Sequence, residues 1–215
     1  MGEHMLNFLE NHDEQRIASE KFCGDPFRAF PAFVVSATMS ACPFMVYAGQ
    51  ELGEPATDAE GYSGHDGRTT IFDYWSVPTL RRWHQGKPRP EERRLRTLYR
   101  RVLRMCNSEK TLARGEFFDL MYVNQDTLNT HRQYAYLRHC DGEMTLVVAN
   151  FGDGAMDSAV RIPQHALDCS QMPAGNYIAE NLLTGEQQMT ALSGDCTLAL
   201  HVEPHDAVLW RFTKQ

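Results

Sequence analysis

The spacing of hydrophobic and polar positions changes about halfway along the chain. Residues 5–11 and 43–48 are short, mostly apolar runs that end in polar residues, which is typical of buried parallel strands. Between them, apolar residues recur every three or four positions and predict a helix over 26–41, with Asp25 as N-cap and Pro26 in the first helical position. This strand–helix–strand order is a βαβ crossover, which predicts that the two strands are parallel.

The middle of the chain predicts a long loop followed by an amphipathic helix. Residues 49–90 carry few periodic signals and many Gly and Pro, so we expect an irregular excursion, and loops of this length are usually functional. Residues 89–107 predict a helix with an apolar stripe. The arginines that follow Pro90 in this helix are interpreted as a solvated face rather than as a nucleic-acid contact, because arginine stems readily lie along neighbouring side chains. They are Arg93, Arg94, Arg96, Arg100, Arg101 and Arg104.

Beyond residue 111 the apolar period becomes two, which predicts strands separated by Gly and Asp turns. Many short strands with regular turns favour an antiparallel sandwich. The predicted strands cover 117–123, 134–138, 144–150, 158–162, 177–181, 187–191, 196–202 and 207–212.

Composition excludes several functional classes. The chain has 215 residues, 42% hydrophobic and 23% charged, which is ordinary globular composition. A net charge of −7 argues against nucleic acid or an anionic membrane as partner, and no apolar run is long enough to span a bilayer. The acidic to neutral N-terminus lacks the features of a signal peptide.

The cysteines and acidic residues do not predict a metal site. None of the six cysteines forms a CxxC pair, which argues against zinc and thiol-redox chemistry. Their scatter suits free thiols in a reducing compartment and favours a cytoplasmic location, while the even count leaves disulfides open. Asp58, Glu60 and Asp66 lack the spacing of a calcium loop.

Candidate chemistry lies where the first apolar run ends, at Glu10, Asn11, His12 and Asp13. Polar side chains at the carboxyl end of a parallel strand are where α/β barrels carry their chemistry. A polar turn without function is the alternative, and the tripeptide Asn-His-Asp alone does not decide between them.

The surrounding sequence resembles a known family. Residues 8–16 (FLENHDEQR) resemble the last signature segment of the α-amylase superfamily of glycoside hydrolases, which ends the seventh strand of that family's (β/α)8 barrel. Residues 43–53 (PFMVYAGQELG) are similar to the eighth strand and the turn after it, and 66–75 to a stretch that follows in some bacterial members. The resemblance implies an α/β part at 1–110, the last two βα units of a TIM barrel. It implies an all-β part at 111–215, an antiparallel Greek-key β-sandwich.

The resemblance also implies roles for single residues in a retaining hydrolysis of α-glucans such as starch and maltooligosaccharides, without a cofactor. Such hydrolysis needs two carboxyl groups about 5 Å apart. In the family a third carboxylate grips the ring hydroxyls in the transition state, and this role falls on Asp13. His12 is implied as a neighbouring donor to the same sugar, with Asn11 and Glu10 as supporting residues. A structural calcium of the full-length enzymes cannot be assigned here.

Two further pairs of residues are candidates for substrate binding. Gln50 and Glu51 follow the second strand and either line the same pocket or serve a structural role. Tyr74 and Trp75 either stack on sugar rings or anchor the long loop.

The family's nucleophile and acid/base motifs have no counterpart in this sequence, and the resemblance places both N-terminal to Met1. We therefore expect a C-terminal fragment that is inactive alone and whose exposed strand edges bind the missing N-terminal barrel portion. A non-catalytic carbohydrate-binding module and a scaffolding relative remain as alternatives.

Overall fold

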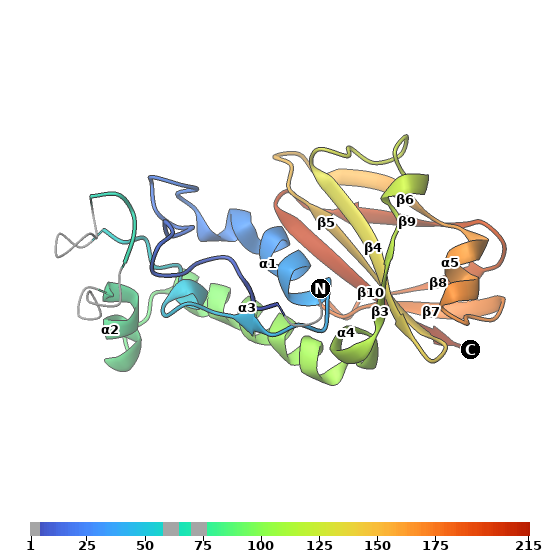
Figure 1. Cartoon of the computed structure of the whole chain (residues 1–215), viewed down its shortest axis with the longest axis horizontal. Coiled ribbons are helices and arrows are strands. Elements are labelled where there is room, and N and C mark those ends of the chain that lie inside the picture. Colours follow the sequence, from blue (N-terminus) through green and yellow to red (C-terminus); the bar gives the residue numbers. More distant parts are fainter. Residues whose placement is uncertain (1–4, 58–64, 70–76) are drawn as a thin grey trace.

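A computed structural model describes residues 5–57, 65–69 and 77–215 (Figure 1). The predicted stacking residues Tyr74 and Trp75 lie outside these ranges. The molecule is elongated, with the longer helices along one half and the larger β-sheets in the other.

The first elements are two short parallel strands on either side of a helix. Strand β1 (Asn7–Phe8) pairs with β2 (Phe44–Met45) in parallel, as predicted, although both strands are much shorter than the apolar runs. The single predicted helix is two elements, a 3₁₀ turn η2 (Pro26–Ala29) and the α-helix α1 (Phe30–Thr38). Asp25 is the predicted N-cap, since its Oδ1 accepts a hydrogen bond of 2.9 Å from the amide of Phe27.

The prediction of an irregular 49–90 segment is wrong in part. It contains a 3₁₀ turn, η3 (Gln50–Leu52), and a helix, α2 (Pro78–His84), which begins at a proline. Both elements are too short to show a periodic apolar stripe. The predicted amphipathic helix is confirmed as α3 (Pro90–Ser108), and a short helix α4 (Lys110–Arg114) follows it.

The C-terminal half is antiparallel β-structure, as predicted. A six-stranded sheet has the order β3-β4-β5-β10-β7-β8, and β6 and β9 form a separate two-stranded sheet. The Greek-key designation stays a prediction. The strands are β3 (Glu116–Asp119), β4 (Gln133–Cys140), β5 (Glu143–Asn150), β6 (Met156–Ile162), β7 (Gly175–Asn181), β8 (Gln187–Leu192), β9 (Cys196–Val202) and β10 (Asp206–Lys214).

One predicted strand ends early, and one helix was not predicted. The strand expected over 117–123 stops at Asp119, because the Asp119 Oδ1 accepts a hydrogen bond of 3.0 Å from the amide of Met121 and the chain turns into η5 (Met121–Val123). Helix α5 (Gln164–Cys169) lies between β6 and β7 and was missed.

The central strands of the six-stranded sheet, β4, β5 and β10, are covered on both faces. One face packs against the β6–β9 sheet, with Leu137, Leu146 and Trp210 facing Val160 and Leu200 in one core. The opposite face packs against α1 and α3, which run beside the sheet (Figure 1). The residues of this second core include Phe33, Val34, Leu95, Tyr99, Val102, Tyr136, Val147 and Leu209.

The second core joins the two predicted parts of the chain, so we expect them to unfold together. The Thr38 hydroxyl of α1 lies 2.6 Å from the Tyr136 hydroxyl of β4, and both residues are buried. Tyr136→Phe removes this hydrogen bond and should lower the free energy of unfolding by about 1 kcal/mol in one cooperative transition. Urea unfolding followed by near- and far-UV circular dichroism measures the free energy of unfolding and the number of transitions. Two separate transitions would contradict the expectation that the two parts unfold together.

Candidate functional site

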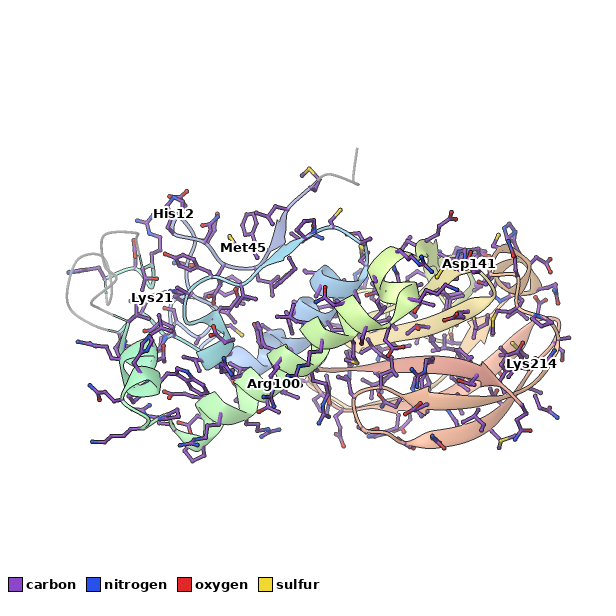
Figure 2. All side chains as sticks on the ribbon, turned by 90° about the horizontal axis from the view of Figure 1, so that it is seen from below. His12, Lys21, Met45, Arg100, Asp141 and Lys214 are labelled. Atoms are coloured by element: carbon purple, nitrogen blue, oxygen red, sulfur yellow. The ribbon has the colours of Figure 1, made fainter. Side chains whose placement is uncertain are left out.

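The loop after β1 presents His12 and Asp13 to solvent. The Asn11 Oδ1 accepts hydrogen bonds from the amides of Asp13 (2.8 Å) and Glu14 (2.9 Å), which turns the chain at the end of the strand. The His12 side chain is 50% exposed and that of Asp13 is 74% exposed, with Nε2 and Oδ2 3.4 Å apart. Figure 2 shows His12 at the surface of the helical half, far along the molecule from Asp141 and Lys214 of the β half.

A buried arginine holds this loop in place. Arg16 and Glu10 are 1% and 2% exposed, and the Arg16 NH1 lies 2.9 Å from the Glu10 Oε2. The same guanidinium donates to the carbonyl of Ala48 (2.7 Å) and to the Thr69 hydroxyl (2.7 Å), and it lies over the ring of Tyr47 at 4.2 Å. One side chain therefore joins the loop after β1, the residues that follow β2 and the 65–69 segment.

Glu10 is committed to this support. Its Oε1 accepts a hydrogen bond of 2.7 Å from the amide of Ile17, and its Oε2 faces Arg16. Burial raises the pKa of Glu10, and the Arg16 guanidinium opposes this shift. Because both oxygens are occupied, Glu10 acts as a positioning residue for the loop rather than as a group that can meet a ligand.

The 65–69 segment packs closely against the same loop. The carbonyl of Gly67 accepts a hydrogen bond of 2.7 Å from the amide of Arg16, and the Gln15 amide group donates to the carbonyl of Asp66 at 3.0 Å. A Cβ at Gly67 would lie 2.2 Å from the Ser19 hydroxyl oxygen, and its φ is +82°, so only glycine allows this approach. The long excursion thus returns to the strand end that carries His12.

The geometry of Gln50 favours the structural alternative. This residue is buried, its Oε1 accepts a hydrogen bond of 3.1 Å from the amide of Tyr47, and its Nε2 donates to the Tyr99 hydroxyl of α3 at 3.1 Å. Glu51 is half-buried, and its charge contributes, behind burial and Glu10, to a raised pKa of Tyr99. Substrate binding by either residue stays a prediction.

Among the residues that the structure describes, this arrangement offers hydrogen-bonding groups at His12 and Asp13, while two nearby carboxylates are bound by other groups of the protein. His12 and Asp13 can together donate to and accept from hydroxyl groups. Glu10 faces Arg16, and the buried Glu54 accepts from the amide (3.1 Å) and hydroxyl (2.6 Å) of Thr79. Neither of these two carboxylates faces solvent.

The described residues provide neither a metal cluster nor a membrane-spanning helix. Residues 5–57, 65–69 and 77–215 hold no cluster of three or more His, Cys, Asp or Glu placed to bind a metal ion. None of the helices in those ranges has both the length and the apolar character that crossing a membrane requires.

The sequence matches no family model and no curated protein. Solved structures do match. The α-amylase from Geobacillus thermoleovorans, complexed with acarbose, has a TM-score of 0.66 at 18% identity, over 99% of this chain and 39% of its own. The maltogenic α-amylase AmyB from Thermotoga neapolitana has a TM-score of 0.62 at 17% identity, over 99% of this chain and 42% of its own. The α-amylase from H. orenii has a TM-score of 0.59 at 16% identity, over 97% of this chain and 40% of its own.

The chain has the fold of the C-terminal part of the α-amylase-family glycoside hydrolases. It spans less than half of the length of each of these structures. The resemblance seen at 8–16 and 43–53 is thereby confirmed at the level of the fold.

Sequence reasoning missed the residues that hold the loop. Arg16 ends the segment that resembles the α-amylase signature, yet no role was assigned to it, and its partner Thr69 lies 53 positions away. The sequence does contain one indication of the ion pair: Arg16 follows Glu10 by six residues within a short segment. Nothing in the spacing of Glu54 and Thr79 indicates their contact.

Proposed function

We propose that this chain is the C-terminal fragment of a retaining α-glucan hydrolase. In this proposal Asp13 stabilises the transition state and His12 binds the same sugar. The observation that carries the proposal is an exposed His12–Asp13 pair, fixed by the buried Glu10–Arg16 ion pair, in a fold shared with α-amylases. The nucleophile and the acid/base belong to polypeptide outside this chain.

Glycoside hydrolysis requires hydrogen-bonding groups at the sugar hydroxyls. Glycosidic cleavage passes through an oxocarbenium-like state in which the sugar ring flattens, and hydrogen bonds to the ring hydroxyls that strengthen there lower the barrier. The Asp13 carboxylate accepts from these hydroxyls, and His12 donates to a neighbouring one. Asn11 contributes through the backbone turn that it stabilises. No cofactor takes part.

The missing barrel portion has a surface to bind. Leu6 and Phe8 are exposed at β1, whose described partner is β2 on one edge. They line a groove of about 360 Å³ together with Val35 of α1 and Met39, the residue directly after this helix. Exposed apolar strand edges readily add another strand. We propose that the N-terminal barrel portion docks along this edge.

The decisive experiment compares two polypeptides. This chain alone, and the chain joined in frame to the polypeptide encoded upstream, are purified and assayed on amylose and pullulan. We expect reducing sugar only from the extended protein. Sugar release by the chain alone would contradict the proposal, and an inactive extended protein would favour the non-catalytic alternatives.

The docking edge is tested with the two parts expressed separately. Phe8→Lys should lower the activity recovered on mixing, because a charge is then buried in the groove. Phe22→Lys, at an exposed aromatic residue that does not line the groove, is the matched control. Equal recovery by both variants would exclude this edge as the docking surface.

A further inference from the structure

The two end strands of the six-stranded sheet differ in length and charge. β3 has four residues, and its exposed first and last residues are Glu116 and Asp119. β8 has six residues, Gln187–Leu192, and none of them is charged, a proline or a glycine. Free sheet edges readily add another strand unless they are short or carry charges or proline. β3 has two of these protections, and β8 has none of them.

One side of β8 has no partner strand among the described residues. β8 pairs antiparallel with β7 from Gln187, opposite Glu180, to Leu192, opposite Gly175. Within 5–57, 65–69 and 77–215, no hydrogen bond joins its backbone to a segment other than β7. Figure 1 shows β8 beside β7 and α5, in the half of the molecule opposite α2. The outer side of β8 therefore offers a row of amide and carbonyl groups to an added strand.

Apolar surface continues from this edge onto one face of the sheet. Met189 is 59% exposed and lies opposite Ile178 of β7, which is half-buried. The core beneath α1 and α3, as far as the structure describes it, contains no residue of β7 or β8. Leu192 points to the other face and is buried in the core shared with β6 and β9. A strand added at this edge would therefore also cover part of the Met189 side chain.

The absence of charge on β8 favours a second copy of this chain as the source of the added strand. In a two-fold symmetric dimer the same surface serves both partners, so β8 of one copy lies antiparallel to β8 of the other. Like charges directly opposite one another destabilise a strand pair. The equivalent pairing of two β3 strands would set Glu116 opposite Asp119 of the other copy, whereas β8 brings no ionisable side chains together. For a chain with a net charge of −7, β8 is the end of the sheet at which two copies meet without opposed carboxylates.

We propose that two copies of this chain associate through β8 and join their six-stranded sheets into one continuous sheet. The two-fold axis passes close to the middle of the strand, so Met189 of each copy lies beside that of the other. One strand pair is smaller than a standard interface of about 800 Å² per partner, so we expect a dimer that dissociates at micromolar concentrations. The proposal involves neither His12 nor Asp13 and does not rest on the proposed function.

The test is sedimentation velocity of the purified chain across the micromolar range, in which we expect a monomer–dimer equilibrium. Met189→Lys should raise the dimer dissociation constant about tenfold, because two lysines then face each other across the axis. Met189→Glu should have the same effect. An equal mixture of the two variants should restore the dimer, because opposite charges then meet. Phe22→Lys, at an exposed residue far from β8 in the sequence, is the control and should leave the dissociation constant unchanged.

The results that would overturn the proposal are distinct from one another. They are a wild-type chain that stays monomeric at all these concentrations, an unchanged dissociation constant in Met189→Lys, and a mixture of the two variants that stays monomeric. Loss of the dimer in Phe8→Lys but not in Met189→Lys would place the contact at the β1 edge and would also overturn it. Circular dichroism shows that each variant is folded. Sugar release by the extended protein, which tests the proposed function, does not enter this measurement.

Discussion

Arg16→Ala should lower the free energy of unfolding by about 3–5 kcal/mol, because it leaves the Glu10 carboxylate buried without its cation. The substitution also removes donors to the carbonyl of Ala48 and the hydroxyl of Thr69. Urea unfolding at neutral pH measures the loss. Arg28→Ala is the matched control, because its ion pair with Asp153 is solvent-exposed and such pairs contribute about 0–1 kcal/mol.

The pH dependence of the Arg16→Ala variant identifies the cause. Burial already raises the pKa of Glu10 above its ordinary value of 4.5, and removal of Arg16 takes away the main opposing charge. A carboxyl whose pKa is raised by folding stabilises the folded state as it takes up a proton. The deficit should therefore be largest at neutral pH and should shrink as the pH falls through the folded-state pKa of Glu10. A deficit below 1 kcal/mol, or one that does not vary with pH, would contradict the role assigned to this ion pair.

Asp13→Asn should lower kcat of the extended enzyme by about 10²–10³-fold, the range typical of removing one group that stabilises transition-state charge. The free energy of unfolding should not change, because the carboxylate is largely exposed and contacts only its neighbour His12 among the contacts described. Initial rates of reducing-sugar release give kcat and KM separately, and KM should change little.

The neighbouring Glu14→Gln provides the control for Asp13→Asn. Glu14 is also an exposed carboxylate in this loop, and its backbone amide donates to the same Asn11 oxygen. Its neutralisation should leave kcat unchanged. Near-wild-type turnover by Asp13→Asn, or an equal loss in Glu14→Gln, would remove Asp13 from the mechanism.

These two predictions concern a buried and an exposed residue of the same loop, Arg16 and Asp13. In the proposed function Asp13 contacts the sugar, and Arg16, three residues later, holds the backbone of this loop through its buried contacts. Second-layer contacts of this kind hold reacting groups within tenths of an ångström of their working position. Arg16→Ala should accordingly lower the activity of the extended enzyme as well as its stability.

The sequence by itself determined the elements whose pattern is local. Strand β9 has the predicted bounds, and α3 differs from its prediction by one residue at each end, because a repeated apolar spacing shows directly which face is buried. The residues after β1 could also be identified as the candidate site from the sequence, because they lie next to one another in the chain.

Only the tertiary structure decided what depends on distant partners. The periodicity of β4 and β5 does not show that both faces of their sheet are covered, one by β6 and β9 and the other by α1 and α3. Nor does the sequence show that Gln50 faces Tyr99 or that Arg16 reaches Thr69, because each contact closes a loop of about fifty residues and leaves no local pattern. Hydrophobic spacing determines which face of each helix or strand is buried. Only the tertiary structure determines which helices and strands pack against that face.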